Sequence, residues 1–132
     1  MDSKKEDCRP APPPALLQAL FDSLKDPVVF VDTNHVIRYL NRRAVRQYRA
    51  GVRLLNRSLL DCHNEKSRQV IRETLRALEA GEEERLIHAL PRKRLYMRAV
   101  RDADGRLLGY YERFEYLTTA AEDGNHGDGE MA

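Results

Sequence analysis

Two adjacent side chains, Cys62 and His63, carry chemistry suited to holding a metal or a haem iron. A thiolate and an imidazole are both common ligands of zinc and of haem iron, and a thiol can also be oxidised. His88 lies in a strand-like segment and could face the same space. Structural roles compete with this interpretation, because such a cysteine is often buried packing and such a histidine often caps the backbone. The cofactor is therefore left open, with His63 as a candidate haem ligand.

Aromatic and arginine side chains in the C-terminal half could line a ligand pocket. Tyr96 and Arg98 lie in one strand-like segment, and Tyr110 lies in the next. A guanidinium such as that of Arg98 could hold a carboxylate ligand, although the aromatics could equally fill the core or cover a dimer surface. Alternation places Tyr110, Phe114 and Tyr116 on one face without fixing which face is inward. The candidate pocket residues are Cys62, His63, Tyr96, Arg98 and Tyr110.

The sequence offers no catalytic constellation. Asp61 and His63 lack a nucleophile in a suitable setting, since neither Ser58 nor Ser67 lies in a nucleophile elbow. The 7 glycines are isolated or lie near the C-terminus, so no glycine-rich phosphate-binding loop is present. We therefore expect a binding protein rather than an enzyme.

The elements that must position these side chains follow from apolar spacing and turn residues. Asn41 and Asn64 are expected helix caps, and Gly81 is an expected helix stop. Tight turns are predicted at 32–35 and 102–105. Between 50 and 63 the chain is expected to be irregular or short-helical. After a short N-terminal helix, helices are predicted at 42–49 and 65–80, and strands at 27–31, 36–40, 85–90, 94–101 and 107–117.

This order of elements predicts the fold class. A helix, two strands, a helical middle and three closing strands suit an antiparallel sheet with helices gathered on one face, an α+β fold. With 132 residues, the chain has the length of one domain. We expect a charged, proline-rich, disordered lead-in at 1–14, a domain at 15–119 and a disordered acidic tail at 120–132.

The short N-terminal helix carries an apolar stripe that a monomer would have to cover. It is expected to begin after the prolines and to end at Pro27. The stripe could pack across the outer face of the sheet or against a second copy of the chain. We take these residues as the candidate dimer interface: Leu16, Leu17, Leu20, Phe21 and Leu24.

The charge distribution separates a basic stretch from an acidic one, at a formal net charge of +2. The stretch 38–57 contains seven arginines and no acid, and such a stretch can attract nucleic acid or another anionic partner. No aromatic stacking pattern or helix-turn-helix signal accompanies it, so we favour a solvated surface and expect no nucleic-acid partner. The acids of 120–132 could fold back onto this surface.

Targeting signals and disulfides are also missing from the sequence. The longest uncharged apolar run, Val28 to Val31, is far too short to cross a bilayer, and no signal peptide is evident. Cys8 and Cys62 do not form a disulfide framework, so both are expected to be reduced thiols. We expect a soluble, cytoplasmic protein without a membrane partner.

Taken together, these segments resemble a PAS domain. The resemblance lies in the hairpin 20–41 with its closing Asn41, the short helix at 56–63, the long helix ending at Gly81 and the hairpin 100–110. It implies a five-stranded antiparallel sheet whose helices enclose a pocket, and a role in sensing small molecules, cofactors, redox state or light, or in dimerisation. The segment at Cys62 and His63 is similar to a PAS subgroup with a Cys-His-Pro sequence, although Asn64 replaces the proline.

One departure from the family bears on output. PAS domains commonly end with an Asp-Ile-Thr-like junction into an effector, whereas Tyr116, Leu117 and Thr118 stand here. We therefore expect a stand-alone sensory module that binds a small molecule or cofactor and signals as a homodimer or through a separate signalling protein. The alternatives are a ligand-free protein–protein adaptor and, less favoured, a haem-binding gas or redox sensor.

Overall fold

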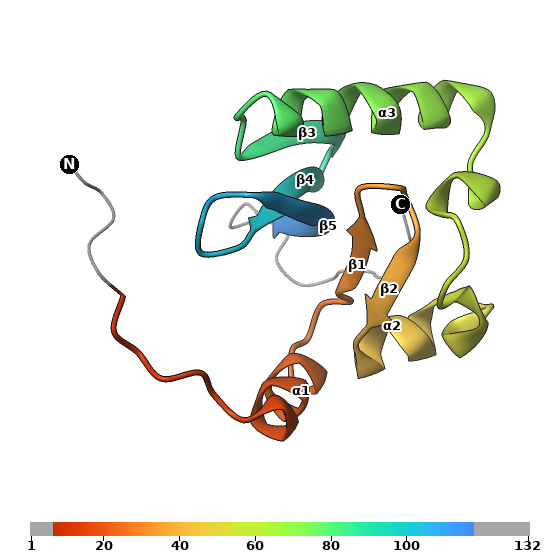
Figure 1. Cartoon of the computed structure of the whole chain (residues 1–132). Coiled ribbons are helices and arrows are strands. Elements are labelled where there is room, and N and C mark those ends of the chain that lie inside the picture. The colour runs from red at the N-terminus through yellow and green to blue at the C-terminus, as the bar shows by residue number, and fades with distance from the viewer. Residues whose placement is uncertain (1–6, 118–132) are drawn as a thin grey trace.

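The computed structural model describes residues 7–117, which form one antiparallel sheet and a set of helices (Figure 1). The helices and strands follow in the predicted order, so the α+β class is confirmed. In chain order the elements are α1 (Pro14–Asp22), β1 (Val29–Asp32), β2 (Ile37–Leu40), α2 (Arg42–Gln47), the 3-10 helices η1 (Gly51–Leu54) and η2 (Leu59–Cys62), α3 (Glu65–Glu79), β3 (Glu84–Leu90), β4 (Lys93–Arg101) and β5 (Leu107–Tyr116).

The sheet joins an N-terminal hairpin to a C-terminal three-stranded meander. Its strand order is β2-β1-β5-β4-β3, and all neighbouring strands are antiparallel. The strands of the two parts meet where β1 pairs with β5, and this pairing is short. Its register is Phe30 with Tyr111, Val31 with Tyr110, and Asp32 with Gly109. Before β1 the chain runs separately from β5, which continues along β4 to Tyr116.

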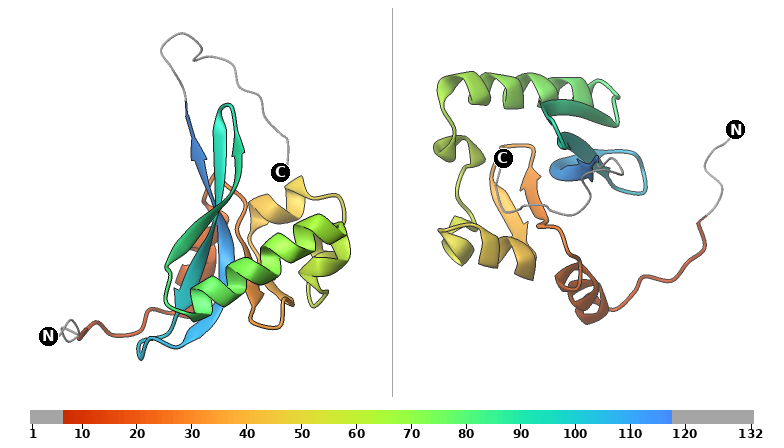
Figure 2. Two further views of the ribbon diagram at one scale, coloured as in Figure 1. Left: turned by 90° about the horizontal axis from the view of Figure 1, so that it is seen from above. Right: turned by 180° about the vertical axis from the view of Figure 1, so that it is seen from behind.

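The long helix α3 covers the inner face of the sheet (Figure 2). As predicted, the Asn64 side chain caps it by accepting a hydrogen bond from the Ser67 amide at 2.9 Å. Gly81 follows its end with a φ of 117°, a backbone conformation that favours glycine. The core between helix and sheet consists of Val31, Ile37, Ile71, Leu75, Leu78, Met97 and Tyr110.

Asn41 joins four segments that are far apart in the sequence. As predicted, its Oδ1 caps α2 by accepting from the Ala44 amide at 3.0 Å, and it also accepts from the Val28 amide at 2.9 Å. Its Nδ2 donates to the carbonyls of Phe21 at 2.8 Å and Asp26 at 3.2 Å. The residue is fully buried. It therefore fixes the end of α1 and the 26–28 connection against β2 and α2.

The helix α1 begins at Pro14 and ends at Asp22, earlier than the expected stop at Pro27. The helix closes at Ser23, whose backbone amide donates to the carbonyl oxygens of Ala19 and Leu20. None of the residues of α1 is buried. Phe21 makes an edge-to-face contact with Tyr39 of β2, at 6.0 Å between ring centroids. Of the other residues of the apolar stripe, Leu16, Leu17 and Leu20 are exposed on α1, and Leu24 lies after the end of the helix.

The chain outside these elements is only partly described. Residues 7–13 of the expected lead-in belong to no helix or strand. Pro14, the last residue of the expected lead-in, is the first residue of α1. Residues 1–6 and the expected acidic tail at 120–132 lie outside the described residues. Within the described part, no helix is long and apolar enough to cross a membrane.

Candidate functional site

The inner face of β4 and β5 is filled by apolar side chains and by Tyr110. The Tyr110 side chain is buried in the same cluster as Met97 and Leu75. Its hydroxyl lies 2.9 Å from Nδ1 of His35, in the turn between β1 and β2. Burial, together with the nearby positive charge of Arg72, lowers the pKa of His35. The neutral imidazole thus shares a hydrogen bond with the core tyrosine.

Tyr96 and Arg98 lie on the opposite face of the sheet from Tyr110. In the β4–β5 register Arg98 pairs with Tyr111, whereas Tyr110 pairs with Ala99. Because directly paired residues share a face and neighbouring residues alternate, Tyr96 and Arg98 point away from the core. The structure therefore does not bring these two candidates together with Tyr110.

The outer face holds Tyr96 and Arg98 in a network of charged groups. Arg98 and Arg113 both donate to the carboxylate of Glu84, with distances of 3.2 Å from Arg98 Nη1 and 2.8 Å from Arg113 Nη2. The hydrogen bond from Arg113 is the main reason why the pKa of Glu84 is lowered. The Arg113 guanidinium also lies 4.4 Å from the centroid of the Tyr96 ring. Glu84 therefore occupies the guanidinium group of Arg98, the residue predicted to hold a carboxylate ligand.

Cys62 and His63 lie at the end of η2, apart from Tyr110 and from the outer face. Cys62 is an exposed free thiol. Nδ1 of His63 lies 3.0 Å from the carbonyl oxygen of Leu59, which can only accept, so Nδ1 carries a proton and Nε2 is left for a ligand. His88 is exposed on β3. Among the described residues, no group of three His, Cys, Asp or Glu side chains could hold a metal ion.

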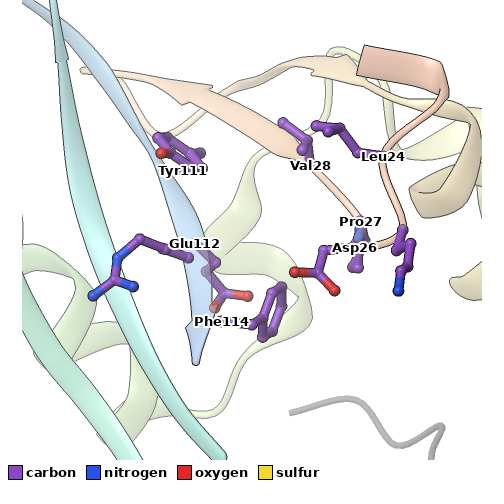
Figure 3. A pocket seen from close by; sticks show the side chains of 9 residues that line it. Leu24, Asp26, Pro27, Val28, Tyr111, Glu112 and Phe114 are labelled. Carbon is purple, nitrogen blue, oxygen red and sulfur yellow. The ribbon is translucent and has the colours of Figure 1, made fainter. Parts of the chain in front are cut away.

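A pocket of about 200 Å³ lies beside β5, where the chain before β1 separates from that strand (Figure 3). We call it the edge pocket. Its apolar walls come from Leu24, Pro27, Val28, Tyr111 and Phe114, and its charged lining residues are Lys25, Asp26, Glu112 and Arg113. Figure 3 shows the carboxyl groups of Asp26 and Glu112 directed toward the same space, beside the Phe114 ring. The backbone of 26–28 is the segment that Asn41 holds.

Glu112 is a partly buried acid that makes no ion pair with any residue from 7 to 117. It lies on the inner face of β5, paired with Met97 of β4, and retains partial exposure to the edge pocket. Within residues 7–117 its carboxyl group has neither a hydrogen bond nor an ion pair. Burial raises its pKa to about 7, and the more distant charge of Lys93 only partly opposes this effect. Glu112 therefore changes charge near neutral pH.

Glu112 is not among the residues predicted for the site, although its place in the sequence carries a signal. The alternation that places Tyr110, Phe114 and Tyr116 on one face also places Glu112 there, between two aromatic residues. Burying an acid in the middle of an otherwise aromatic strand face costs free energy unless the carboxyl group is hydrogen-bonded or paired with a charge. The alternation of side chains thus indicates that Glu112 is unusual, but it does not predict the edge pocket beside Glu112.

Replacing Glu112 with glutamine is expected to remove a pH dependence of stability. The folded chain holds the Glu112 proton up to about pH 7, whereas the unfolded chain releases it near its ordinary value of 4.5. The free energy of unfolding should therefore fall as the pH rises between these values, by up to about 3 kcal/mol. Urea unfolding of wild-type and Glu112→Gln chains at several pH values measures this, and the variant should be more stable than wild type at pH 8.

The matched control is Glu115→Gln, an acid on the same strand but on its outer face, where it accepts from the Tyr96 hydroxyl. This variant keeps Glu112 and should keep the wild-type fall in stability with pH. Equal slopes for wild-type and Glu112→Gln chains would show that Glu112 titrates as it does in water.

The arginine-rich stretch lies on the surface of β2, α2 and η1. Arg38 bonds to Asp32 at 2.9 Å, and Arg42 lies 3.9 Å from Asp22. The arginines that follow on and after α2 are exposed and make no ion pair with any residue from 7 to 117; they are Arg43, Arg46, Arg49, Arg53 and Arg57.

Comparisons with known proteins agree on the fold. A family model described as the PAS fold matches residues 21–122. The PAS domain of BvgS from Bordetella pertussis is 16% identical, with a TM-score of 0.56 over 81% of this chain and 88% of that one. A PAS domain from Colwellia psychrerythraea is 12% identical, with a TM-score of 0.58 over 79% and 98%.

A third structure comes from a sensor protein. A sensory box sensor histidine kinase from Vibrio cholerae is 17% identical, with a TM-score of 0.56 over 80% of this chain and 91% of that one. No curated protein matches the sequence. At these identities the structural likeness concerns the fold alone.

Proposed function

The chain belongs to the PAS fold family, and on that premise we propose that it is a sensory module that binds a small molecule and signals through dimerisation or a separate protein. PAS domains are generally sensory or signalling modules without catalytic activity. We propose a binding role for this one as well, with the cytoplasm as its compartment.

The exposed apolar stripe of α1 is the observation that carries this proposal. No residue of α1 is buried, and Leu16 and Leu20 are 56% and 55% exposed. A continuous apolar strip of this kind is unfavourable in water and favours a partner surface. A second copy of the same helix supplies a surface of matching chemistry, because two-fold interfaces are self-complementary. We therefore propose that the α1 stripe mediates the homodimer.

One observation favours the alternative of a ligand-free adaptor. The space between α3 and the sheet is occupied by side chains that are almost completely buried, among them Leu78, Met97 and Tyr110. A filled interior of this kind needs no ligand. For the sensory proposal, the binding site would be the edge pocket, which lies outside that core.

Haem binding is a further alternative, and it depends on His63. With Nδ1 bonded to a backbone carbonyl, the ring presents Nε2, the arrangement that histidine ligands of metals commonly adopt. The exposed position of the neighbouring Cys62 supplies no enclosing apolar wall. We therefore rank this alternative below the other two.

Native mass spectrometry and absorbance of the purified full chain test the proposal together. We expect the mass of a dimer carrying a small molecule, without a haem band. In Leu20→Glu, which places a charge in the centre of the stripe, the dimer should dissociate at a concentration at least tenfold higher. The control is Val52→Glu, which changes another exposed apolar residue outside the stripe.

Each part of the proposal has its own contrary outcome. A chain that is monomeric in both wild-type and variant form contradicts the dimer. A dimer without any bound small molecule contradicts ligand binding and supports the adaptor. A visible haem band that disappears in His63→Ala supports the haem alternative, and a band that survives removes His63 from that site.

A further inference from the structure

We propose that the edge pocket binds a small organic cation, an ammonium group held between the Asp26 and Glu112 carboxylates against the Phe114 ring. This inference rests on the proposed sensory function and adds the chemical class of the ligand. It depends on the size of the pocket, on its charges and on its aromatic lining.

The size of the pocket limits the ligand. About 200 Å³ is the volume that roughly seven molecules of liquid water occupy. This volume is below the range of about 300 to 1,000 Å³ that is usual for ligand pockets, so a drug-sized molecule or a flat macrocycle does not fit within it. The apolar walls from Leu24, Pro27 and Val28 suit a compact aliphatic group.

The charges of the pocket favour a positive ligand. Asp26 and Glu112 direct their carboxyl groups into it, and neither has a hydrogen bond or an ion pair within residues 7–117 (Figure 3). The lining also includes two cations, but Arg113 is bonded to Glu84 on the outer face of the sheet. Lys25 makes no ion pair with either acid. The two acids therefore remain available to a ligand.

Phe114 and Tyr111 extend this preference to organic cations. An ammonium group beside an aromatic ring is attracted by the electrons of the ring face, and more strongly where water is excluded. A metal ion would instead need several oxygen or nitrogen ligands, and no described group of three such side chains is present. Two carboxylates among apolar and aromatic walls are better suited to an alkylammonium ion than to a bare metal.

Proton release from Glu112 would accompany binding. Lys93 of β4 is the charged group that acts on Glu112, and the Glu112 carboxylate in turn raises the pKa values of Tyr48, at the end of α2, and of Tyr110 on its own strand. Asp26 lines the same pocket. Burial raises the pKa of Glu112 to about 7, so the ionised form becomes about tenfold more populated between pH 6 and pH 8. A cation should bind more tightly by about that factor at pH 8, provided that it keeps its own charge.

Choline and its neutral isostere 3,3-dimethylbutan-1-ol test the proposal on the full chain. The two probes have the same shape, and choline carries a permanent charge that does not titrate. NMR titration should show that choline shifts the backbone amide signals of residues 24–26, 28 and 112–114, and that it binds at least tenfold more tightly than the alcohol does. Glu112→Gln should weaken choline binding at least tenfold at pH 8 and abolish its pH dependence, whereas Glu115→Gln should leave both unchanged. Putrescine provides a second probe with primary ammonium groups.

The possible failures separate this inference from the proposed function. If the alcohol binds as tightly as choline, or if Glu112→Gln binds choline as wild type does, the pocket is not a cation site. The same holds if neither cation shifts the signals of residues 24–26, 28 and 112–114. A neutral or anionic molecule that copurifies with the chain would overturn the cation but retain the sensory module. A chain that binds no small molecule in either experiment would overturn both.

Discussion

A chain with alanine in place of Gly109 is expected to lose roughly 3 kcal/mol or more of its folding stability. Gly109 lies opposite Asp32, where β1 meets β5. A Cβ atom at this position would lie 2.9 Å from Cα of Asp32 and 2.7 Å from the Phe30 ring, and it would overlap the carbonyl oxygen of Val31. Two of these obstacles are backbone atoms, so a side-chain rotation cannot relieve them. The strands would have to separate.

Thermal unfolding measures this effect, and the melting temperature should fall by roughly 10 °C or more. The control is Gly105→Ala, in the turn between β4 and β5. No atom lies within 4 Å of a Cβ at Gly105, and its φ of 85° is the only source of strain. That variant should lose about 1 kcal/mol. Equal losses in the two variants would show that β1 and β5 are not in close contact.

Replacing Asn41 with alanine is the second large effect we expect, with a loss of about 3 to 5 kcal/mol. The substitution removes hydrogen bonds to the amides of Val28 and Ala44 and to the carbonyls of Phe21 and Asp26. A buried polar group left without a partner costs about 1 to 3 kcal/mol, and water can reach some of these four. Because Asn41 holds the backbone of residues 26–28, which line the edge pocket, these residues should also become more mobile in the variant.

Urea unfolding measures the loss, and hydrogen exchange at the Val28 and Ala44 amides locates it. The control is Asn64→Ala, which removes an exposed cap with a single bond to the Ser67 amide. Loss of such a cap costs about 1 kcal/mol. If the two asparagine variants unfold at the same urea concentration, Asn41 stabilises the fold only as a helix cap, and its bonds to Phe21, Asp26 and Val28 contribute nothing.

The contrast between Asn41 and Asn64 shows which hydrogen bonds can be predicted from the sequence and which cannot. Both caps could be predicted because a cap depends on residues two or three positions away. The other partners of Asn41 lie 13 to 20 positions before it, and nothing in the local pattern points to them. The same applies to Gly109, whose neighbour across the sheet is Asp32.

The position of Arg98 shows a different limit. In the structure Arg101 pairs with Leu107 beside the turn, and a regular ladder counted outward from that pair would place Arg98 opposite Tyr110. In the structure the register shifts between Val100 and Arg101, so that Val100 pairs with Gly109 and Arg98 with Tyr111. A shift of one residue moves every later side chain to the other face. The segments could thus be predicted from the sequence, whereas the faces of the strands depended on one bulge.

The short pairing of β1 with β5 determines where the folded domain should open locally. Three residue pairs join the N-terminal hairpin to the meander, while the β4–β5 pairing runs along the full length of β4. Partial opening of a folded protein begins where the fewest interactions hold it. The hairpin of β1 and β2 should therefore separate from β5 before the other strands separate. The edge pocket lies next to this β1–β5 pairing. A molecule bound in the edge pocket would hold the two parts of the sheet together, so the population of the opened state should decrease as the pocket fills.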